Sequence, residues 1–383
     1  MKKKFYLILL VILTAFSSYG QDSVSTGSLT ITGYVDTYYQ YNLNSPSDRK
    51  NGGRIFDVYH NNFSLGLVQT AFKYTYGKAE AVLDLTYGPN AELGNFGNSG
   101  TSKIIKQAYL AYGFTDKLKF TIGQFGTHIG YELIDAPLNY NYSLSYLFGN
   151  GPFYHTGAKL NYTFSDKAGI MVGVVNGWDG LQDFNDKKSL AAQVFVSPVE
   201  GVNLYLNWIG GDEYNTLSAF GSKKGSFTNL FDLTGTVAAS DKISLGVNAA
   251  YGMFSSGYAK EITDEDIAAA DPVSAGILEA DQGKYDKDAS WFGVAGYANV
   301  AFNDVFGLGL RVEHFNDPDG VRYFGPLVVN ALTATANIAL AEGRFNIKPE
   351  IRFDAADSEF FVENEGKAKK TQTTLGSAFI LKF

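Results

Sequence analysis

TLGSAFILKF, residues 374–383, is the last stretch of the chain, and its pattern decides the fold. Counting back from the end, every second residue is apolar or small: Phe383, Leu381, Phe379, Ser377 and Leu375. Alternate residues of a strand point to the same side, so these five form one stripe. Chain ends are usually frayed and polar. A stripe that continues to the last residue must therefore contact an apolar surface, which is either a protein core or lipid.

The first long pattern, LTITGYVDTYYQYNL at residues 29–43, favours lipid. Apolar side chains such as Leu29 and Ile31 alternate with polar ones such as Thr30 and Asp36 along the stretch. At ~3.3 Å per residue such a strand is roughly 50 Å long, whereas strands of soluble proteins usually have about five or six residues. This length fits a tall barrel whose strands cross a membrane at a tilt.

The same alternation recurs along the chain, and the connections between the patterns alternate in length. In residues 62–76 the apolar set changes phase, which indicates either a bulge near Gly66 to Val68 or an inward-facing aromatic set. Seven short connections and eight long ones imply sixteen strands. The sequence therefore predicts an all-β fold: a transmembrane antiparallel up-and-down β-barrel of about 16 strands, with short periplasmic turns and long extracellular loops. Further patterned segments occupy residues 79–87, 117–125, 157–164, 202–210, 306–314 and 344–354.

Residues 1–20 have the pattern of a secretory signal peptide. Three lysines precede an apolar run at residues 5–15, and Ser18-Tyr19-Gly20 forms a small-residue cleavage site. The apolar run is shorter than the ~20 residues that a membrane-spanning helix needs. We therefore expect cleavage near Gly20, with residues 21–383 forming a single transmembrane barrel in a bacterial outer membrane.

Composition excludes several classes of function. Without the three lysines of the signal, 28 Lys and Arg residues stand against 39 Asp and Glu residues, a net charge of about −11. Phosphate binding needs clustered cations, so nucleic acid is not an expected partner. The chain has no cysteine, and its four histidines lack the i,i+4 spacing of a zinc site. Because no complete catalytic or nucleotide-binding motif is present either, we expect no catalytic residue, no metal and no cofactor.

A stripe that faces lipid also predicts how the barrel closes. The carboxyl-terminal strand must pair with the strand at residues 29–43, because each unsatisfied backbone group at an open edge in hydrocarbon costs several kcal/mol. A terminal phenylalanine behind an alternating apolar stripe resembles the assembly signal of bacterial outer-membrane barrels. This resemblance implies the barrel-assembly machinery as a partner that recognises Phe383.

Four short motifs stand in the middle of the chain: Gly130-Tyr131-Glu132, Asn141-Tyr142-Ser143, Pro152-Phe153-Tyr154-His155-Thr156-Gly157 and Asn176-Gly177-Trp178-Asp179. Together with GYVDTYYQYN at residues 33–42, they resemble the OmpL-like family of β-barrel porins. The resemblance covers about residues 30–180, and beyond them only the strand-and-loop pattern supports it. It implies an outer-membrane pore for passive diffusion and carries over no catalytic residue.

A sixteen-stranded barrel leaves an aqueous channel, so the plain interpretation is a porin. The connection 126–153 has just two carboxylates, Glu132 and Asp135, and we expect it to fold into the lumen as a constriction. A surface loop over the mouth is the alternative. Facing cations would complete a transverse field across a narrow opening; the candidates are Arg311, Lys348 and Arg352. Further lining candidates are Asp36, Asp84, Lys119, Glu313 and Glu350, and the charged positions Glu80, Lys159 and Asp354 lie on the same side of their strands.

Residues 255–289 hold nine carboxylates against three lysines, which predicts a weak preference for cations at the outer mouth. Screening limits the reach of these charges to about 8 Å at physiological salt. Within this connection, Thr263 and Asp266 resemble a capping box that opens a short helix, which Pro272 would end.

The expected partners are the lipid bilayer, with its outer-membrane lipids, and small hydrophilic solutes. The sequence is compatible with a homo-oligomer and does not fix the oligomeric state. Two other functions remain open at this point. One is a surface receptor or adhesin that the barrel anchors, and the other is a lipid-modifying enzyme, for which Ser143 and His155 would be the reactive pair.

Overall fold

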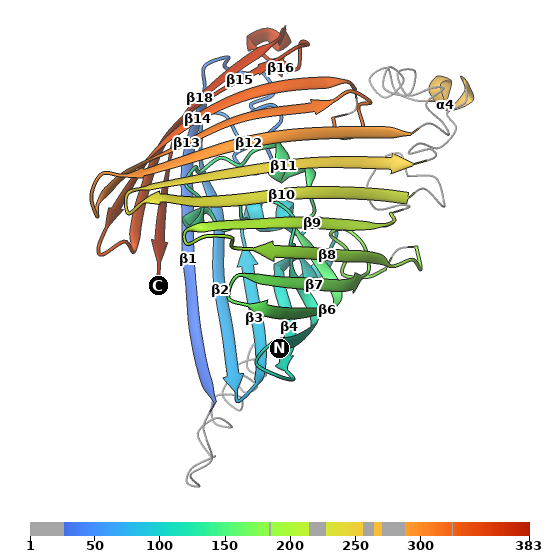
Figure 1. Ribbon diagram of the computed structural model, residues 1–383. Coiled ribbons are helices and arrows are strands. Elements are labelled where there is room, and N and C mark those ends of the chain that lie inside the picture. Colours follow the sequence, from blue (N-terminus) through green and yellow to red (C-terminus); the bar gives the residue numbers. More distant parts are fainter. Residues whose placement is uncertain (1–26, 184, 214–226, 256–263, 270–287, 324) are drawn as a thin grey trace, which may run out of the picture.

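In the residues that the computed structural model describes, sixteen strands form one closed antiparallel barrel (Figure 1). The structure describes residues 27–183, 185–213, 227–255, 264–269, 288–323 and 325–383, and the predicted signal peptide lies outside them. The predicted fold class and strand number are confirmed. The barrel strands are β1 (Ser28–Asn42), β2 (Asn62–Tyr76), β3 (Ala79–Tyr87), β4 (Ile105–Gly113), β5 (Leu118–Gly126), β6 (Tyr154–Ser165), β7 (Ala168–Val175), β8 (Ser189–Val196), β9 (Val202–Asp212), β10 (Phe227–Ser240), β11 (Ile243–Ser255), β12 (Ala289–Ala301), β13 (Phe306–Asp317), β14 (Leu327–Leu340), β15 (Phe345–Ala356) and β18 (Thr371–Lys382).

The last strand closes the barrel against the first. β18 pairs with β1 in a register that runs from Lys382 opposite Tyr34 to Thr374 opposite Asn42. Beyond this ladder, Gly33 and Phe383 exchange two backbone hydrogen bonds of 3.1 and 2.9 Å. The apolar stripe therefore continues to the final residue because the final residue is still paired, as the sequence predicted.

Tight turns join the strands at one end of the barrel, and long connections join them at the other end. The last long connection forms a small ladder of β16 (Phe361–Val362) and β17 (Ala368–Lys369) with a short helix between them. Short helices also occur in the connections from β3 to β4, from β5 to β6 and from β11 to β12. None of the helices in the described ranges is both long and apolar enough to cross a membrane. The helices are α2 (Pro89–Gly94), η1 (Gly100–Ile104), η2 (Ala136–Leu138), α3 (Tyr146–Asn150), α4 (Asp264–Ala269) and η3 (Asn364–Gly366).

Most of the acidic connection lies outside the described residues. Helix α4 falls where a short helix was predicted, but the expected capping residue Thr263 and the expected stop at Pro272 are not among the described positions. The predicted effect of this acidic connection on ion preference therefore stays a prediction.

A bulge in β2 explains the change of phase seen in the sequence. The pairing of β1 with β2 shifts between Val35 and Thr37, so that Asp36 faces two residues, Gly66 and Leu67. Leu67 turns into the barrel and is buried. A Cβ atom at Gly66 would overlap the carboxylate of Asp36, so glycine is needed where the bulge brings the two strands together.

The two faces of the barrel have opposite chemistry. Outward-facing apolar side chains are highly exposed: Leu110 by 62 % and Val312 by 57 %. Inward-facing charged side chains such as Arg311 and Asp354 have no exposure at all. A soluble protein buries its apolar residues, so this inverted arrangement fits a wall that is wetted by lipid outside and lined by polar groups inside.

Candidate functional site

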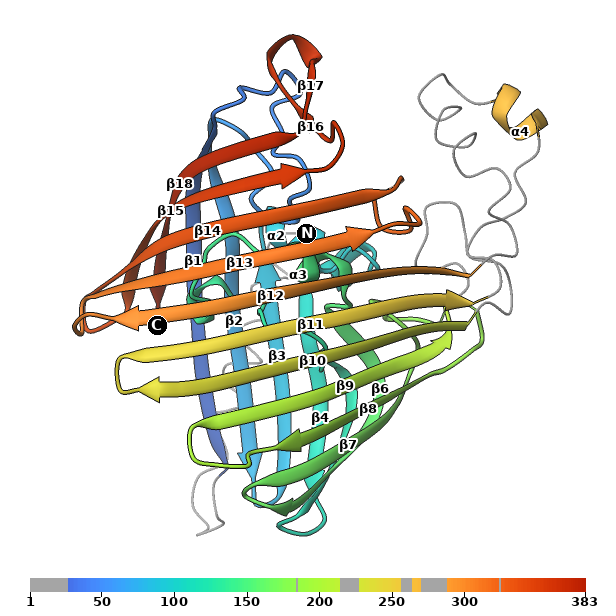
Figure 2. The ribbon, with the colours of Figure 1, turned by 45° about the horizontal axis from the view of Figure 1, so that its top comes forward.

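The connection between β5 and β6, residues 127–153, contacts inward-facing side chains around the barrel and is named the inner segment. Its backbone N–H groups donate to Asp232 on β10 and to Glu313 on β13, each at 2.9 Å. The ring of Tyr131 stacks on Tyr297 of β12, with centroids 4.3 Å apart. Because these partners point into the barrel, the inner segment crosses its interior, and its helix α3 lies behind the front strands in Figure 2.

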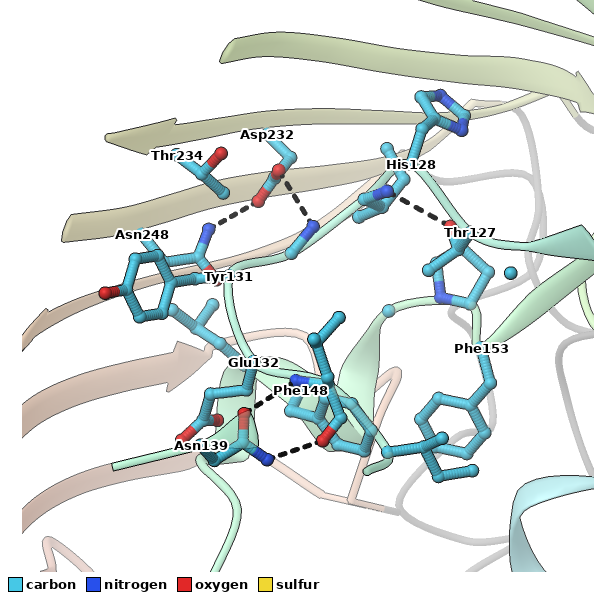
Figure 3. Close-up of a pocket in the computed structure, with 18 of the residues that line it drawn as sticks. Thr127, His128, Tyr131, Glu132, Asn139, Phe148, Phe153, Asp232, Thr234 and Asn248 are labelled. Atoms are coloured by element: carbon cyan, nitrogen blue, oxygen red, sulfur yellow. Dashed lines mark hydrogen bonds between the residues drawn. The ribbon is translucent and has the colours of Figure 1, made fainter. Parts of the chain in front are cut away.

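Short-range hydrogen bonds give the inner segment its shape. The side chain of Asn139 accepts from the N–H of Leu133 (2.9 Å) and donates to the carbonyl of the same residue (2.6 Å), as Figure 3 shows. Ser145 caps α3, since its hydroxyl accepts a backbone N–H of the first turn at 3.0 Å. The wall leaves room for the segment: a Cβ atom at Gly309 would lie 2.8 Å from the carbonyl oxygen of Tyr140.

A buried ion pair joins the inner segment to β13. Glu132 Oε1 lies 2.5 Å from Arg311 Nη1, and both side chains are almost completely buried. Arg311 also donates to the carbonyl of Ser143 (2.5 Å) and to the hydroxyl of Thr333 (3.2 Å). The second oxygen of Glu132 accepts from the N–H of Ser145 at 2.8 Å. The pair is thus hydrogen-bonded on both sides, which a charge out of contact with water requires.

Strand β15 supplies three further charged anchors. Glu350 accepts two successive backbone N–H groups of the inner segment, at 2.7 and 3.1 Å. Arg352 donates to the carbonyl of Leu144 (2.6 Å) and pairs with Asp354 (2.7 Å). Lys348 donates to another carbonyl of the inner segment. These buried groups hold the segment against the wall.

The opposite edge of the inner segment is held by β1, β3 and β4. Lys106 Nζ lies 2.5 Å from Asp135 and 3.3 Å from Asp84, so one cation is shared by two carboxylates. Asp36 accepts from the hydroxyl of Tyr142 at 3.0 Å. The segment is therefore fixed to both sides of the barrel.

Nine of the ten predicted site residues thus belong to the inner segment or to the wall that holds it, and Lys119 stands apart. Lys119 lies on β5 near the tight turns and pairs with Glu80 at 3.2 Å. One expectation differs from the structure: Glu132 and Arg311 do not face each other across an opening but are in direct contact. Both are buried, and a buried charge is stable only beside its partner.

A second connection also sends a charge into the barrel. Within residues 43–61, which join β1 to β2, the side chain of Arg54 is fully buried and bridges Asp57 (2.7 Å) and Asp354 (2.9 Å). The side of the lumen near β15, β18 and β1 is therefore filled by two connections.

Open space remains on the other side of the inner segment. The central cavity, of about 530 Å3, lies between the inner segment and the inner wall of β8 to β12, and Figure 3 shows Asp232, Thr234 and Asn248 facing it. The basal cavity, also about 530 Å3, lies beside β4, β5 and β6 near the tight turns. Because both cavities are lined by Gln107 and Gly126, they are neighbours along one side of the barrel.

The central cavity is acidic. Asp232 accepts from the amides of Asn207 (2.7 Å) and Asn248 (2.5 Å), and among the described residues it has no cationic partner. Burial lowers the pKa of His128 to about 4, so this ring adds no positive charge at neutral pH. The charged residues of the lining are one lysine and three carboxylates, which leave two negative charges: Lys106, Glu132, Asp135 and Asp232.

Among the described residues of this lumen, the predicted set lacked Asp232, Lys106 and Arg54 with its partner Asp57. Asp232 alternates with Phe231 and Leu233 and so carried the signal that identified the others. Lys106 lies where the ladder between β3 and β4 shifts register. Simple alternation along β4 therefore assigns Lys106 to the lipid side, although its side chain points into the lumen. Arg54 lies in a polar connection, where no periodic pattern marks a buried residue.

A family model described as "Putative beta-barrel porin-2, OmpL-like" matches residues 28–383. A search of curated protein sequences gave no match.

Several solved structures share the fold. The outer membrane channel DcaP of Acinetobacter baumannii aligns with a TM-score of 0.60 and 12% identity, over 95% of this chain and 99% of that chain. An anion-selective porin from Comamonas acidovorans aligns with a TM-score of 0.58 and 10% identity, over 94% and 100%. OprB of Pseudomonas putida aligns with a TM-score of 0.56 and 13% identity, over 93% and 94%. At these identities the likeness shows the fold alone.

The family match covers every strand of the barrel, and the barrel is apolar toward its surroundings and polar inside. This architecture places the protein in the bacterial outer membrane. The chain belongs to the OmpL-like family of β-barrel porins.

Proposed function

We propose that this porin lets ions and small hydrophilic solutes diffuse past the inner segment through the central and basal cavities, with a weak preference for cations. The single observation that carries the cation preference is Asp232, a carboxylate that lines the central cavity without a cationic partner among the described residues. A fixed charge beside an aqueous path raises the local concentration of counter-ions.

The inner segment acts in this proposal as the constriction. Glu132 and Asp135 hold the segment in place through Arg311 and Lys106, and they also line the central cavity. Because each of them is paired with a cation, their net contribution to ion preference is smaller than that of Asp232. The inner segment sets the width of the path, and Asp232, which has no cationic partner among the described residues, biases which ions pass.

Planar-bilayer recording of the wild type and of Asp232→Asn tests the proposal. At 4 Å in water a single charge contributes about 1 kcal/mol, so the loss of this carboxylate should lower the potassium-to-chloride permeability ratio by about two- to fivefold. Asp241→Asn is the matched control, since it removes the same charge from an exposed tight turn. The cation preference is refuted by a wild-type reversal potential that favours anions, or by an unchanged ratio in Asp232→Asn.

Liposome swelling separates a porin from the alternatives that the sequence left open. A barrel that only anchors a receptor or adhesin, or that modifies lipids, need not admit small sugars. The proposed pore should admit them at a rate that falls with solute size. If liposomes that carry the folded protein stay impermeable to small sugars, the proposed diffusion through the barrel is wrong.

The same proposal includes recognition of Phe383 by the barrel-assembly machinery. The terminal ring is 56 % exposed on the lipid side of the closing seam. Deleting Phe383 removes its two backbone bonds to Gly33 and should lower the amount of assembled barrel in the outer membrane severalfold, which heat-modifiable gel mobility measures. Phe302→Ala removes a ring of similar exposure (50 %) near a tight turn and should assemble normally. Equal assembly of the two variants would argue against the role of Phe383.

A further inference from the structure

The basal cavity has chemistry opposite to that of the central cavity. Its lining contains three lysines, Lys117, Lys119 and Lys159, and a single carboxylate, Asp116. These charges leave two positive charges in a space of about 530 Å3 near the tight turns. The pore proposed above therefore carries a negative cavity beside the inner segment and a positive one next to it.

The carboxylates near the basal cavity do not neutralise it. Glu80 is shared by Lys73 (2.9 Å) and Lys119 (3.2 Å), so this group of three still carries a positive charge. Asp116 pairs at 3.1 Å with Lys78, a residue outside the cavity lining, so its charge is already balanced by another lysine. Cations therefore outnumber carboxylates also when the residues next to the cavity lining are included.

Lys159 is the least compensated of the three lysines. Its side chain is half-buried on the inner face of β6, and its Nζ lies 4.1 Å from the centroid of the Phe125 ring. Among the residues that the structure describes, it makes no ion pair or hydrogen bond. A cation over an aromatic face keeps its N–H donors for a further ligand. A partly dehydrated ammonium group without an anion gains more from binding one than an exposed lysine does.

Side chains with neutral donor groups line the basal cavity together with Lys159. Thr121 of β5 and Asn161 and Thr163 of β6 line the basal cavity, as does Gln107 of β4. Hydroxyl and amide groups beside an ammonium group can donate to the remaining oxygens of a carboxylate or phosphate. The wall thus combines charge with directional donors.

We propose that the basal cavity is a binding site for small oxyanions, in which Lys159 is the principal ligand and Lys119 and Lys117 add charge. The ligand class comprises solutes that carry carboxylate or phosphate groups. Such a site holds an anion at the periplasmic end of a pore whose central cavity favours cations. Site occupancy should fall steeply with salt, because screening weakens the attraction from the outlying lysines.

Calorimetric titration of the mature folded chain in micelles of an uncharged detergent tests the site, with inorganic phosphate and citrate as separate probes at low ionic strength. Saturable binding of at least one probe is expected. Lys159→Gln should weaken it by about tenfold or more, because a hydrogen bond to a charged group contributes about 1.5–3 kcal/mol. Lys159→Arg keeps the charge and should bind within a few-fold of the wild type.

Lys167→Gln is the matched control, since it removes a lysine from an exposed tight turn at the same end without touching the cavity. The proposal is overturned if neither probe binds the wild type, or if Lys167→Gln weakens binding as much as Lys159→Gln does. If Lys159→Gln does not assemble, Lys119→Gln at a half-exposed position should weaken binding by a smaller factor, and unchanged binding in that variant also counts against the site. Binding in micelles does not require conduction. The binding result therefore tests the anion site even if the conductance experiment fails to support the proposed pore.

Discussion

The ion pair between Glu132 and Arg311 gives the sharpest test of how the inner segment is held. Glu132→Gln keeps the size of the side chain and removes its charge. The arginine then retains the carbonyl of Ser143 and the hydroxyl of Thr333 but loses the carboxylate that lies 2.5 Å from it. Both side chains are at most 3 % exposed, so solvent cannot replace the lost partner. Stranding one member of such a pair costs about 3–5 kcal/mol.

A local cost of this size should shift the equilibrium between the docked and lifted segment by about 100-fold or more, since ~1.4 kcal/mol corresponds to a factor of ten. The chain has no cysteine, so a single introduced thiol is a unique probe. Leu144→Cys places that thiol at a buried position of the inner segment. Its rate of labelling by a water-soluble thiol reagent reports how often the segment lifts.

We expect slow labelling of Leu144→Cys alone and labelling about 100-fold faster when Glu132→Gln is added. Glu200→Gln, which removes a carboxylate from an exposed tight turn, is the control and should leave the rate unchanged. A change of less than about threefold in the Glu132→Gln background would refute the reasoning, because the buried arginine would then tolerate the loss of its partner.

Two further predictions concern stability. Gly66→Ala puts a methyl group against the carboxylate of Asp36 in the β2 bulge and should lower the free energy of unfolding by about 1–3 kcal/mol in urea titrations, whereas Gly149→Ala, whose Cβ would lie 3.7 Å from the nearest atom, should not. Burial raises the pKa of Asp179, in the connection after β7, from 3.8 to about 7, so the folded state binds this proton more tightly than the unfolded chain. Stability from this group is complete below about pH 4 and is lost as the pH rises through 7, by at most about 4 kcal/mol. The loss of thermal stability from about pH 5 to pH 8 should therefore be smaller in Asp179→Asn than in the wild type, and an identical loss would contradict the assignment.

Alternation predicted the wall of this barrel well because membrane strands obey one simple rule. Each residue faces either lipid or lumen, so the period-two pattern of β1 or β13 is enough to assign every side chain. The pattern failed where the backbone departs from that rule. The bulge in β2 turned Leu67 inward, and the register shift beside Lys106 hid an inward cation.

The lumen was harder to predict than the wall. Sequence composition singled out the connection 126–153 and its two carboxylates, but the partner of each carboxylate depends on where an irregular chain crosses the barrel. Asp135 binds Lys106 rather than a cation of β13 or β15, and Arg54 enters from a different connection altogether. Contacts of this kind join residues with no shared period, so no pattern along the chain encodes them.

The seam between β1 and β18 has a consequence for the order of assembly. Thr37 and Phe379, which meet there, are 342 residues apart in the chain. Bringing two such distant points together costs about 5 kcal/mol of loop entropy, estimated as (3/2)RT ln n. Contacts this remote also form slowly. Strand β1 therefore gains its second neighbour only when β18 is in place, and a chain that ends before β18 cannot form this seam.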